Sequence, residues 1–195
     1  LLKKLTQKIK DSNLEDKNIS ENAIFLFKNE YEAYGSLDLI GTKTFDGPSE
    51  FLKDFKFTIK ETTEGKESPE FTVPCENGVI TFSNSLSILS YEYKPTMKLD
   101  DRGTHTYEIR EVIPADDSKA PGVKYDERIY KVTVDVTDDG EGKLVPTVKS
   151  ITSELIGGGQ EPYDFFVGSD ENRANYFTFE NKYEANADLL FKGMK

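Results

Sequence analysis

Short runs of alternating apolar and polar residues make up most of the chain. β-branched and aromatic residues dominate these runs, and turn signals such as FDGP, ENG, DDRG and DDGEG separate them. Successive side chains of a strand point to opposite faces, so this alternation predicts strands. The predicted strands are SLDLIGTKTF (36–45), DFKFTIKE (54–61), EFTVP (70–74), GVITFS (78–83), THTYEIREV (104–112), RIYKVTVDV (128–136), KLVPTVKSI (143–151) and NYFTFENKY (175–183).

Eight or so strands at this spacing predict an all-β fold, an immunoglobulin-like sandwich with little helix. The Asp-Gly in TVDVTDDGEGKLVPTV, between two alternating runs, predicts a hairpin. Residues 1–12 are expected to form a short amphipathic helix, and FLKD (51–54) a single turn. Residues 153–174, SELIGGGQEPYDFFVGSDENRA, are expected to form a long irregular loop.

Three polar side chains fall on the apolar face of their predicted strands. Lys43, Glu111 and Asn181 each alternate in phase with large apolar residues, whereas Lys56 and Lys60 alternate out of phase. Burying such groups without partners costs several kcal/mol for each charge. The three are therefore expected either to contact one another or to lie at strand ends, where the alternation fades and the side chains reach solvent.

If these residues meet inside the sandwich, they form a reactive set. Desolvation lowers the pKa of a lysine and raises that of a glutamate. A neutral Lys43 amine is a competent nucleophile. A protonated Glu111 can hydrogen-bond the Asn181 carboxamide oxygen, polarise its carbon and pass protons to the leaving ammonia. The expected product is a Lys43–Asn181 isopeptide bond, formed once and without a cofactor.

The chain repeats itself at an offset of 152 residues. FLFKNEYEAYGSLDLIGTK (25–43) aligns with FTFENKYEANADLLFKGMK (177–195), and 9 of the 19 positions are identical. A period of this length suits whole domains in tandem rather than a solenoid. We therefore expect three parts: residues 1–30 as the C-terminal end of a preceding module, 31–184 as a complete module, and 185–195 as the first strand of a following module.

The same alignment gives the cross-link residues counterparts near both ends of the chain. Lys195 aligns with Lys43, and Asn29 aligns with Asn181. Each counterpart lacks its partners within its own repeat, so Asn29 and Lys195 are candidate positions for a cross-link between modules.

Composition narrows the classes of function. The chain has 25 Lys and Arg against 36 Asp and Glu, a formal net charge of −11, which argues against a nucleic-acid binder because such proteins need a basic surface. No apolar run reaches the roughly 18 residues of a membrane span, and no signal segment is present. The chain is therefore expected to be either cytosolic or an internal piece of an exported protein, and the repeat favours the second.

Few residues remain for other chemistry. The single cysteine, Cys75, excludes an internal disulfide and is expected to be a small buried apolar side chain. His105 is the only histidine, which excludes a histidine-based metal cluster or triad, and it is expected simply to begin a strand. The acidic turn in 135–142 lacks EF-hand spacing and is expected to be a solvated hairpin. No metal or cofactor is expected.

Four motifs, taken in order and spacing, resemble the isopeptide-containing domains of Gram-positive pilin shaft proteins and surface adhesins. This is the streptococcal pilin type, related to the collagen-adhesin B-type domains, and the resemblance covers essentially all of 31–184. It implies that Lys43 is the bond-forming lysine, Glu111 the catalytic acid and Asn181 the asparagine. Glu111 is followed by Val-Ile-Pro rather than by the Thr-x-Ala-Pro of B-type domains, a departure that concerns subtype. The motifs are GTKTFDG (41–47), YEIREV (107–112), PGVKYDERIYKVTVDVTDDGEGKL (121–144) and FTFENKY (177–183).

The resemblance implies a structural stalk module of a bacterial cell-surface pilus or adhesin, extracellular and anchored to the cell wall. Its partners would be neighbouring modules or subunits of the same surface protein, and it would not be an enzyme beyond its own single cross-linking event. The alternative is an adhesive domain that recognises a host molecule through surface loops, with Tyr163, Phe165 and Phe166 as the aromatics to test. Tandem repetition favours the stalk, because spacers are repeated and tip domains usually are not.

Overall fold

The computed structural model describes residues 29–83, 86–94, 100–156 and 176–186. Contacts divide the chain into two units, Leu1–Glu30 and Tyr31–Lys195, and the second contains every strand given below. The helix expected in residues 1–12 lies outside the described residues. The protein is an all-β sandwich, as the alternation predicts.

One face of the sandwich is a five-stranded antiparallel sheet in the order β10-β9-β7-β3-β4. Its inward residues alternate with outward ones in the period-two pattern read from the sequence. A register shift between Val148 and Ser150 puts a bulge in the edge strand β10. The strands are β3 (Lys56–Glu61), β4 (Glu70–Pro74), β7 (Gly103–Glu111), β9 (Arg128–Asp138) and β10 (Leu144–Leu155).

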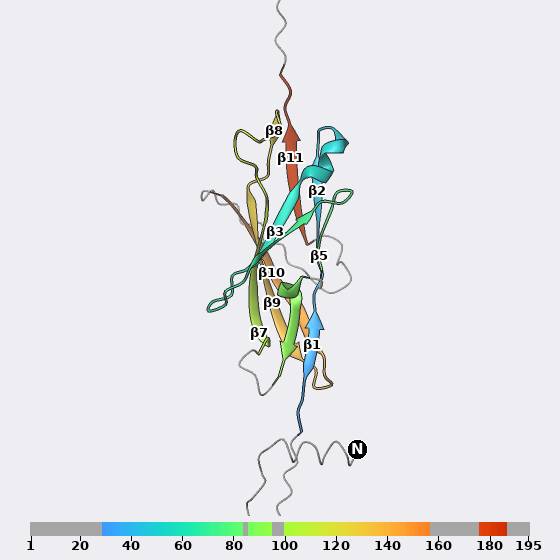
Figure 1. Cartoon of the computed structure of the whole chain (residues 1–195), viewed down its shortest axis with the longest axis vertical. Coiled ribbons are helices and arrows are strands. Elements are labelled where there is room, and N and C mark those ends of the chain that lie inside the picture. The colour runs from blue at the N-terminus through green and yellow to red at the C-terminus, as the bar shows by residue number, and fades with distance from the viewer. Residues whose placement is uncertain (1–28, 84–85, 95–99, 157–175, 187–195) are drawn as a thin grey trace, which may run out of the picture. The chain divides into compact units, whose positions relative to one another are not determined.

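The opposite face is a four-stranded sheet in the order β5-β2-β11-β8, in which β2 and β11 run parallel (Figure 1). These two strands are far apart in the sequence and central in the sheet, so the start and the end of the fold lie side by side. A separate two-stranded sheet joins β1 to β6. The strands are β1 (Ala33–Ser36), β2 (Leu39–Phe45), β5 (Val79–Phe82), β6 (Ser90–Tyr93), β8 (Val123–Lys124) and β11 (Phe177–Tyr183).

An aromatic cluster fills the core between the two sheets beside β2 and β11. Phe179 packs against Phe57 of the facing sheet at a centroid distance of 5.0 Å and against Tyr130 at 5.1 Å. Phe177 lies over Gly41, where a Cβ would meet the ring at 2.1 Å, which explains a glycine on the apolar face of β2. Burying each large apolar side chain stabilises the fold by roughly 1.5–3 kcal/mol. The cluster also excludes water from the polar groups next to it.

All eight predicted strands that the alternation outlines are present, with ends that differ by a few residues. The Asp-Gly hairpin joins β9 to β10 as predicted, and FLKD lies in a 3-10 turn, η1 (Ser49–Asp54). The short strands β1, β6 and β8 and the 3-10 turn η2 (Ser87–Leu89) were not predicted, because two to four residues carry too little alternation. The long loop begins later than expected, since β10 extends to Leu155, and residues 157–175 lie outside the described residues.

Candidate functional site

Lys43, Glu111 and Asn181 meet inside the sandwich. Lys43 Nζ donates a hydrogen bond to Glu111 Oε2 over 2.8 Å, and Asn181 Nδ2 donates one to Glu111 Oε1 over 2.7 Å. None of the three is more than 3% exposed. The alternative that these side chains reach solvent at strand ends is therefore wrong, even though Glu111 is the last residue of β7.

The strands fix how the three side chains approach one another. On the parallel pair β2 and β11, Lys43 stands opposite Phe179, and Asn181 lies two residues further along β11. Residues two apart share a face, so Lys43 and Asn181 point inward from neighbouring strands. Glu111 comes from the facing sheet, where it pairs with Phe57. One carboxylate thus spans the gap between the sheets and contacts both an amine and a carboxamide.

Burial shifts both ionisable groups of this site toward their neutral forms. Desolvation lowers the pKa of Lys43 from its usual value, outweighing the attraction of Glu111. Desolvation likewise raises the pKa of Glu111, outweighing the hydrogen bonds from Lys43 and Asn181. The Phe55 ring, 4.8 Å from Lys43 Nζ, forms part of the apolar wall. A neutral amine beside a carboxyl group that can accept and return a proton is the pair that acyl transfer requires.

The carboxamide oxygen of Asn181 is bound differently from the expectation. The sequence argument assigned it to a protonated Glu111, but Oδ1 accepts a hydrogen bond from the main-chain N–H of Asp126 over 2.8 Å. Glu111 instead accepts from the amide nitrogen. Both polar groups of the carboxamide therefore have a hydrogen-bond partner: the oxygen accepts from an N–H, and the NH₂ group donates to a carboxyl oxygen.

Asp126 and Arg128 are part of this site and were missed by the sequence reasoning. The Asp126 carboxylate accepts hydrogen bonds from the Glu180 N–H over 2.7 Å, the Arg128 N–H over 2.9 Å and the Arg128 guanidinium. Asp126 is only 8% exposed. The available signal was an Asp-x-Arg at the start of a predicted strand, which also fits an ordinary turn.

The remaining residues singled out in the sequence lie in the core, on the surface or outside the described residues. Cys75 is buried in the core, as expected, and burial raises the pKa of its thiol. Asn29 is exposed and precedes β1, while Lys195 lies outside the described residues. The loop aromatics Tyr163, Phe165 and Phe166 also lie outside them.

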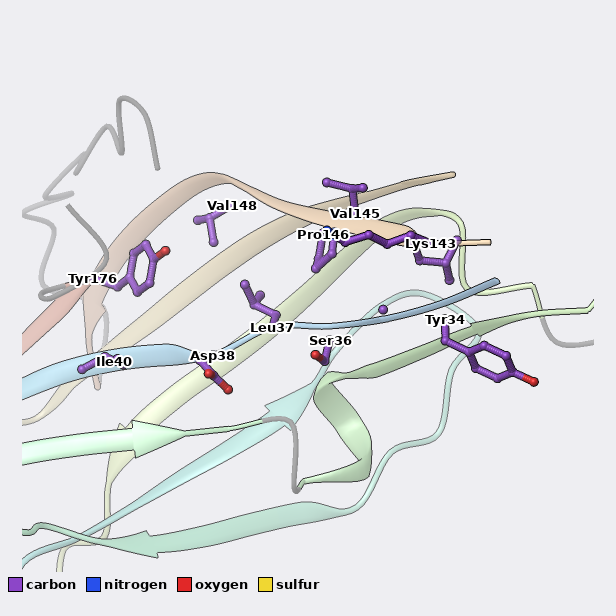
Figure 2. Close-up of a pocket in the computed structure, with 12 residues that line it drawn as sticks. Tyr34, Ser36, Leu37, Asp38, Ile40, Lys143, Val145, Pro146, Val148 and Tyr176 are labelled. Atoms are coloured by element: carbon purple, nitrogen blue, oxygen red, sulfur yellow. The ribbon is translucent and has the colours of Figure 1, made fainter. Parts of the chain in front are cut away.

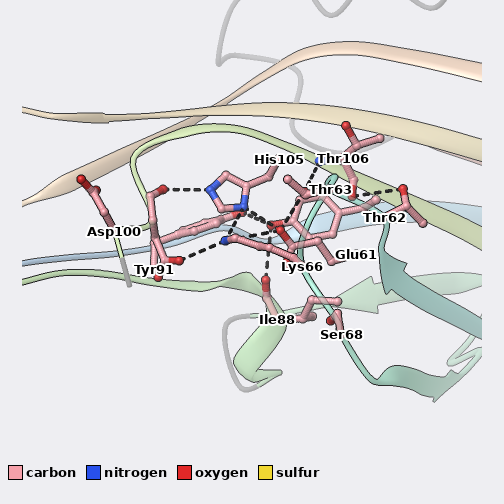
Figure 3. A network of polar contacts seen from close by, with 12 residues as sticks. Glu61, Thr62, Thr63, Lys66, Ser68, Ile88, Tyr91, Asp100, His105 and Thr106 are labelled. Carbon is pink, nitrogen blue, oxygen red and sulfur yellow. Dashed lines mark hydrogen bonds and ion pairs between the residues drawn. The ribbon is translucent and has the colours of Figure 1, made fainter. Parts of the chain in front are cut away.

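His105 is not a simple strand start but the centre of a second polar network (Figure 3). Its Nδ1 lies 2.9 Å from Glu61 Oε1, and its Nε2 lies 2.8 Å from the main-chain oxygen of Asp101. Lys66 Nζ lies 3.5 Å from Glu61 and 3.1 Å from Asp101, and its side chain is 33% exposed. This network places a lysine beside two carboxylates but has no carboxamide, and the side chains of Lys66 and Asp101 are 33% and 21% exposed.

Glu61 is expected to make the fold sensitive to acid. Desolvation raises its pKa, but hydrogen bonds from His105 and Thr63 and the charge of Lys66 outweigh it, so its pKa lies below the ordinary 4.5. The stabilisation is complete above that value and is lost as pH falls through the folded-state pKa. Glu61→Gln should cost about 2 kcal/mol at neutral pH, typical of a hydrogen bond to a charged group, and flatten the loss below pH 4.5.

Urea unfolding across this pH range measures both effects. Glu154→Gln, which removes an exposed ion pair with Lys131, is the control and should change stability by less than about 1 kcal/mol. An acid response of Glu61→Gln identical to that of the wild-type protein would contradict the assignment.

A surface groove of about 470 Å³ lies between the β1–β2 segment and β10 (Figure 2). Its walls combine apolar side chains such as Leu37, Val148 and Tyr176 with the charged Asp38 and Lys143. These charges come from opposite walls, and none of Lys43, Glu111 and Asn181 lines the groove. It offers no specific support for the adhesive alternative.

The acidic hairpin after β9 has a structural explanation. Asp138 Oδ1 accepts hydrogen bonds from the Gly140 N–H and the Tyr31 hydroxyl, and Asp139 Oδ1 accepts from the Glu141 and Lys143 N–H groups. Among the described residues, no group of three His, Cys, Asp or Glu side chains is arranged to hold a metal ion. Nor does that part of the chain contain a helix long and apolar enough to span a membrane.

Comparison with known proteins adds a family match. Residues 39–184 match the model of FctA, the Spy0128-like isopeptide-containing domain. No curated protein matches the chain. Solved structures that match include a point variant of the major pilin from Streptococcus pyogenes, with 19% identity, a TM-score of 0.37, and coverage of 76% of this chain and 51% of that one. Another is the T3.2 major pilin from S. pyogenes serotype GAS13637, with 18% identity, a TM-score of 0.38, and coverage of 76% and 52%. The chain spans about half the length of these pilins.

Proposed function

Because the chain belongs to the family of Spy0128-like isopeptide-containing domains, we propose that it supplies a structural module of a bacterial pilus shaft or a similar surface fibre, cross-linked internally by a Lys43–Asn181 isopeptide bond. One observation carries the proposal. A single buried carboxyl group, that of Glu111, contacts both the Lys43 amine and the Asn181 amide nitrogen. Such a module is extracellular and modifies only itself, once.

The geometry supports a direct acyl transfer. The neutral Lys43 Nζ attacks Cγ of Asn181, and the carbon–nitrogen bond to Nδ2 breaks as the new one forms. Glu111 accepts a proton from Nζ through Oε2 and delivers one to Nδ2 through Oε1, so that nitrogen leaves as ammonia. The carboxyl group ends in its starting protonation state. The reaction requires no cofactor and is complete after one turnover.

The cross-link stabilises the module because it joins the two central strands of one sheet. It would close a loop of about 140 residues, from β2 to β11. The chain-entropy relation for covalent loops gives a stabilisation of about 5 kcal/mol for that length. A chain with one cysteine has no internal disulfide, and this bond would take that role.

Intact mass tests the proposal. The folded chain is expected to weigh less than its sequence by the mass of one ammonia, and proteolytic mapping should yield a branched peptide that contains Lys43 and Asn181. Lys66 is an internal control: it lies near Glu61 and Asp101 but is 33% exposed, and the pKa of Glu61 is lowered rather than raised. It is expected in a linear peptide. A chain with its full sequence mass would rule out the bond.

The flanking segments extend the proposal to neighbouring modules. In this reading residues 1–30 end one module, 31–184 form the complete one and 185–195 begin another, and the repeat of 25–43 at 177–195 supports these boundaries. Asn29 and Lys195 would then serve the cross-links of the neighbours or join two modules. Partners of the module would be further modules or subunits of the same fibre on the cell surface.

A further inference from the structure

The main-chain N–H of Asp126 points at the oxygen on which charge develops during the proposed reaction. We propose that this N–H stabilises the oxyanion that forms on Asn181 Oδ1, and that the Asp126 carboxylate and Arg128 hold it in position. The inference rests on the proposed cross-linking reaction. It adds a catalytic main-chain group and two positioning side chains to Lys43, Glu111 and Asn181.

The reaction places negative charge on Oδ1. When Nζ of Lys43 adds to Cγ of Asn181, the carbonyl double bond opens and Oδ1 becomes an oxyanion until ammonia leaves. Glu111 cannot serve this oxygen while it contacts the two nitrogen atoms. The Asp126 N–H already lies 2.8 Å from Oδ1 and is aimed at it in the resting state. A donor held in a dry site strengthens as the charge develops and needs no reorganisation.

The Asp126 side chain fixes this N–H relative to the carboxamide. Its carboxylate binds the Glu180 N–H on β11, one residue before Asn181, and the Arg128 N–H and guanidinium at the start of β9. Desolvation raises its pKa, but the Arg128 and main-chain hydrogen bonds outweigh that effect, so the pKa lies below its usual value. An ionised carboxylate therefore joins the loop that carries the donor to the strand that carries the acceptor.

The rate of ammonia loss tests the inference. The full chain is isolated unfolded in denaturant before cross-linking, refolded by dilution, and sampled by intact mass. Asp126→Ala should slow the first-order loss roughly tenfold to a hundredfold, because one oxyanion donor is worth about 10²–10³ in rate and the N–H is loosened rather than removed. Asp126→Asn, which keeps one acceptor oxygen, should recover part of the rate, and Arg128→Ala should slow it less than Asp126→Ala does.

Asp46→Ala is the matched control. The Asp46 carboxylate also accepts a β11 main-chain hydrogen bond, from the Tyr183 N–H, but it does so two residues beyond Asn181. The rate of ammonia loss from the Asp46→Ala chain should stay within about twofold of the wild-type rate. This result separates the effect of the oxyanion donor from that of losing any carboxylate that binds the β11 main chain. Equal slowing by Asp46→Ala and Asp126→Ala would assign both aspartates a purely structural role and overturn the inference.

A spectroscopic measurement covers variants that fold poorly. In the Glu111→Ala chain, which stays unlinked, a through-hydrogen-bond NMR coupling between the Asp126 amide nitrogen and Asn181 Cγ is expected, and Arg128→Ala should weaken it. Absence of the coupling in a folded chain overturns the inference. Wild-type rates from Asp126→Ala and Asp126→Asn also overturn it but leave the proposed cross-link intact, whereas a wild-type chain that never loses ammonia removes both.

Discussion

The Glu111→Ala chain should keep the full mass of its sequence, whereas the wild-type chain should lack one ammonia. The carboxyl group of Glu111 is the group that contacts both nitrogen atoms of the reaction. Without it, the proton on Nζ has no carrier to Nδ2, and general acid–base catalysis of this kind is worth about 10²–10⁴ in rate. Intact mass after days of incubation measures the loss directly.

Glu111→Gln sharpens this result. Glutamine keeps the size of the side chain and can still hydrogen-bond, but it cannot carry a proton between the two nitrogen atoms. It should also retain the full mass. A Glu111→Gln chain that loses ammonia at the wild-type rate would assign Glu111 a packing role and exclude the proton transfer proposed for it.

Thermal unfolding should report the same bond. Lys43→Met replaces the amine with an apolar side chain of similar length, so it removes the cross-link without leaving an unpaired buried lysine. Loss of a loop closure of about 140 residues should cost about 5 kcal/mol. For a module of this size that corresponds to a fall in melting temperature of roughly 10–20 °C. Glu111→Ala should fall further, because it leaves Lys43 buried without its partner.

Single-molecule stretching should show the largest mechanical difference. In the cross-linked module, force applied at the two ends passes along β2 to Lys43, across the bond to Asn181, and out along β11. The residues between Lys43 and Asn181 cannot extend. In Glu111→Ala they can, and about 140 residues at roughly 3.5 Å each add close to 480 Å of extension.

A pulling experiment with flanking marker domains measures this extension. The wild-type module should add only the length of the residues outside the bond, and Glu111→Ala should add the full length in one step. Asp46→Ala, which leaves the three reacting residues in place, should behave like the wild-type module. An equal extension for wild-type and Glu111→Ala would mean that the covalent bond does not carry the load.

Much of the site could be predicted because its residues lie on strands with a clear alternation. Lys43, Glu111 and Asn181 each follow apolar residues in phase, so a period of two was enough to place them inward. The alternation does not indicate which strands pair. Nothing in the local sequence shows that β2 and β11 are parallel neighbours or that β7 lies in the sheet facing them. The resemblance to a known family supplied the connection between the three residues.

The hydrogen-bonding partners contributed by loops could not be predicted in the same way. Asp126 lies between β8 and β9, where there is no alternation, and it acts through its main-chain N–H, a group that every residue except proline carries. His105 was expected only to begin a strand, and its partners Glu61 and Lys66 lie at a strand end and in a turn. Such contacts depend on how loops return to the strands, which a single sequence does not reveal.

Glu111 lies on the sheet opposite Lys43 and Asn181, and this position determines whether folding or formation of the proposed bond comes first. The three groups come into contact only when the two sheets have packed, so the proposed bond would form after the first folding and could not accelerate it. Once cross-linked, an unfolded chain would keep β2 and β11 joined, and the entropy of bringing these distant strands together would no longer have to be overcome. We therefore expect a cross-linked module that is stretched or heated to refold faster than it first folded.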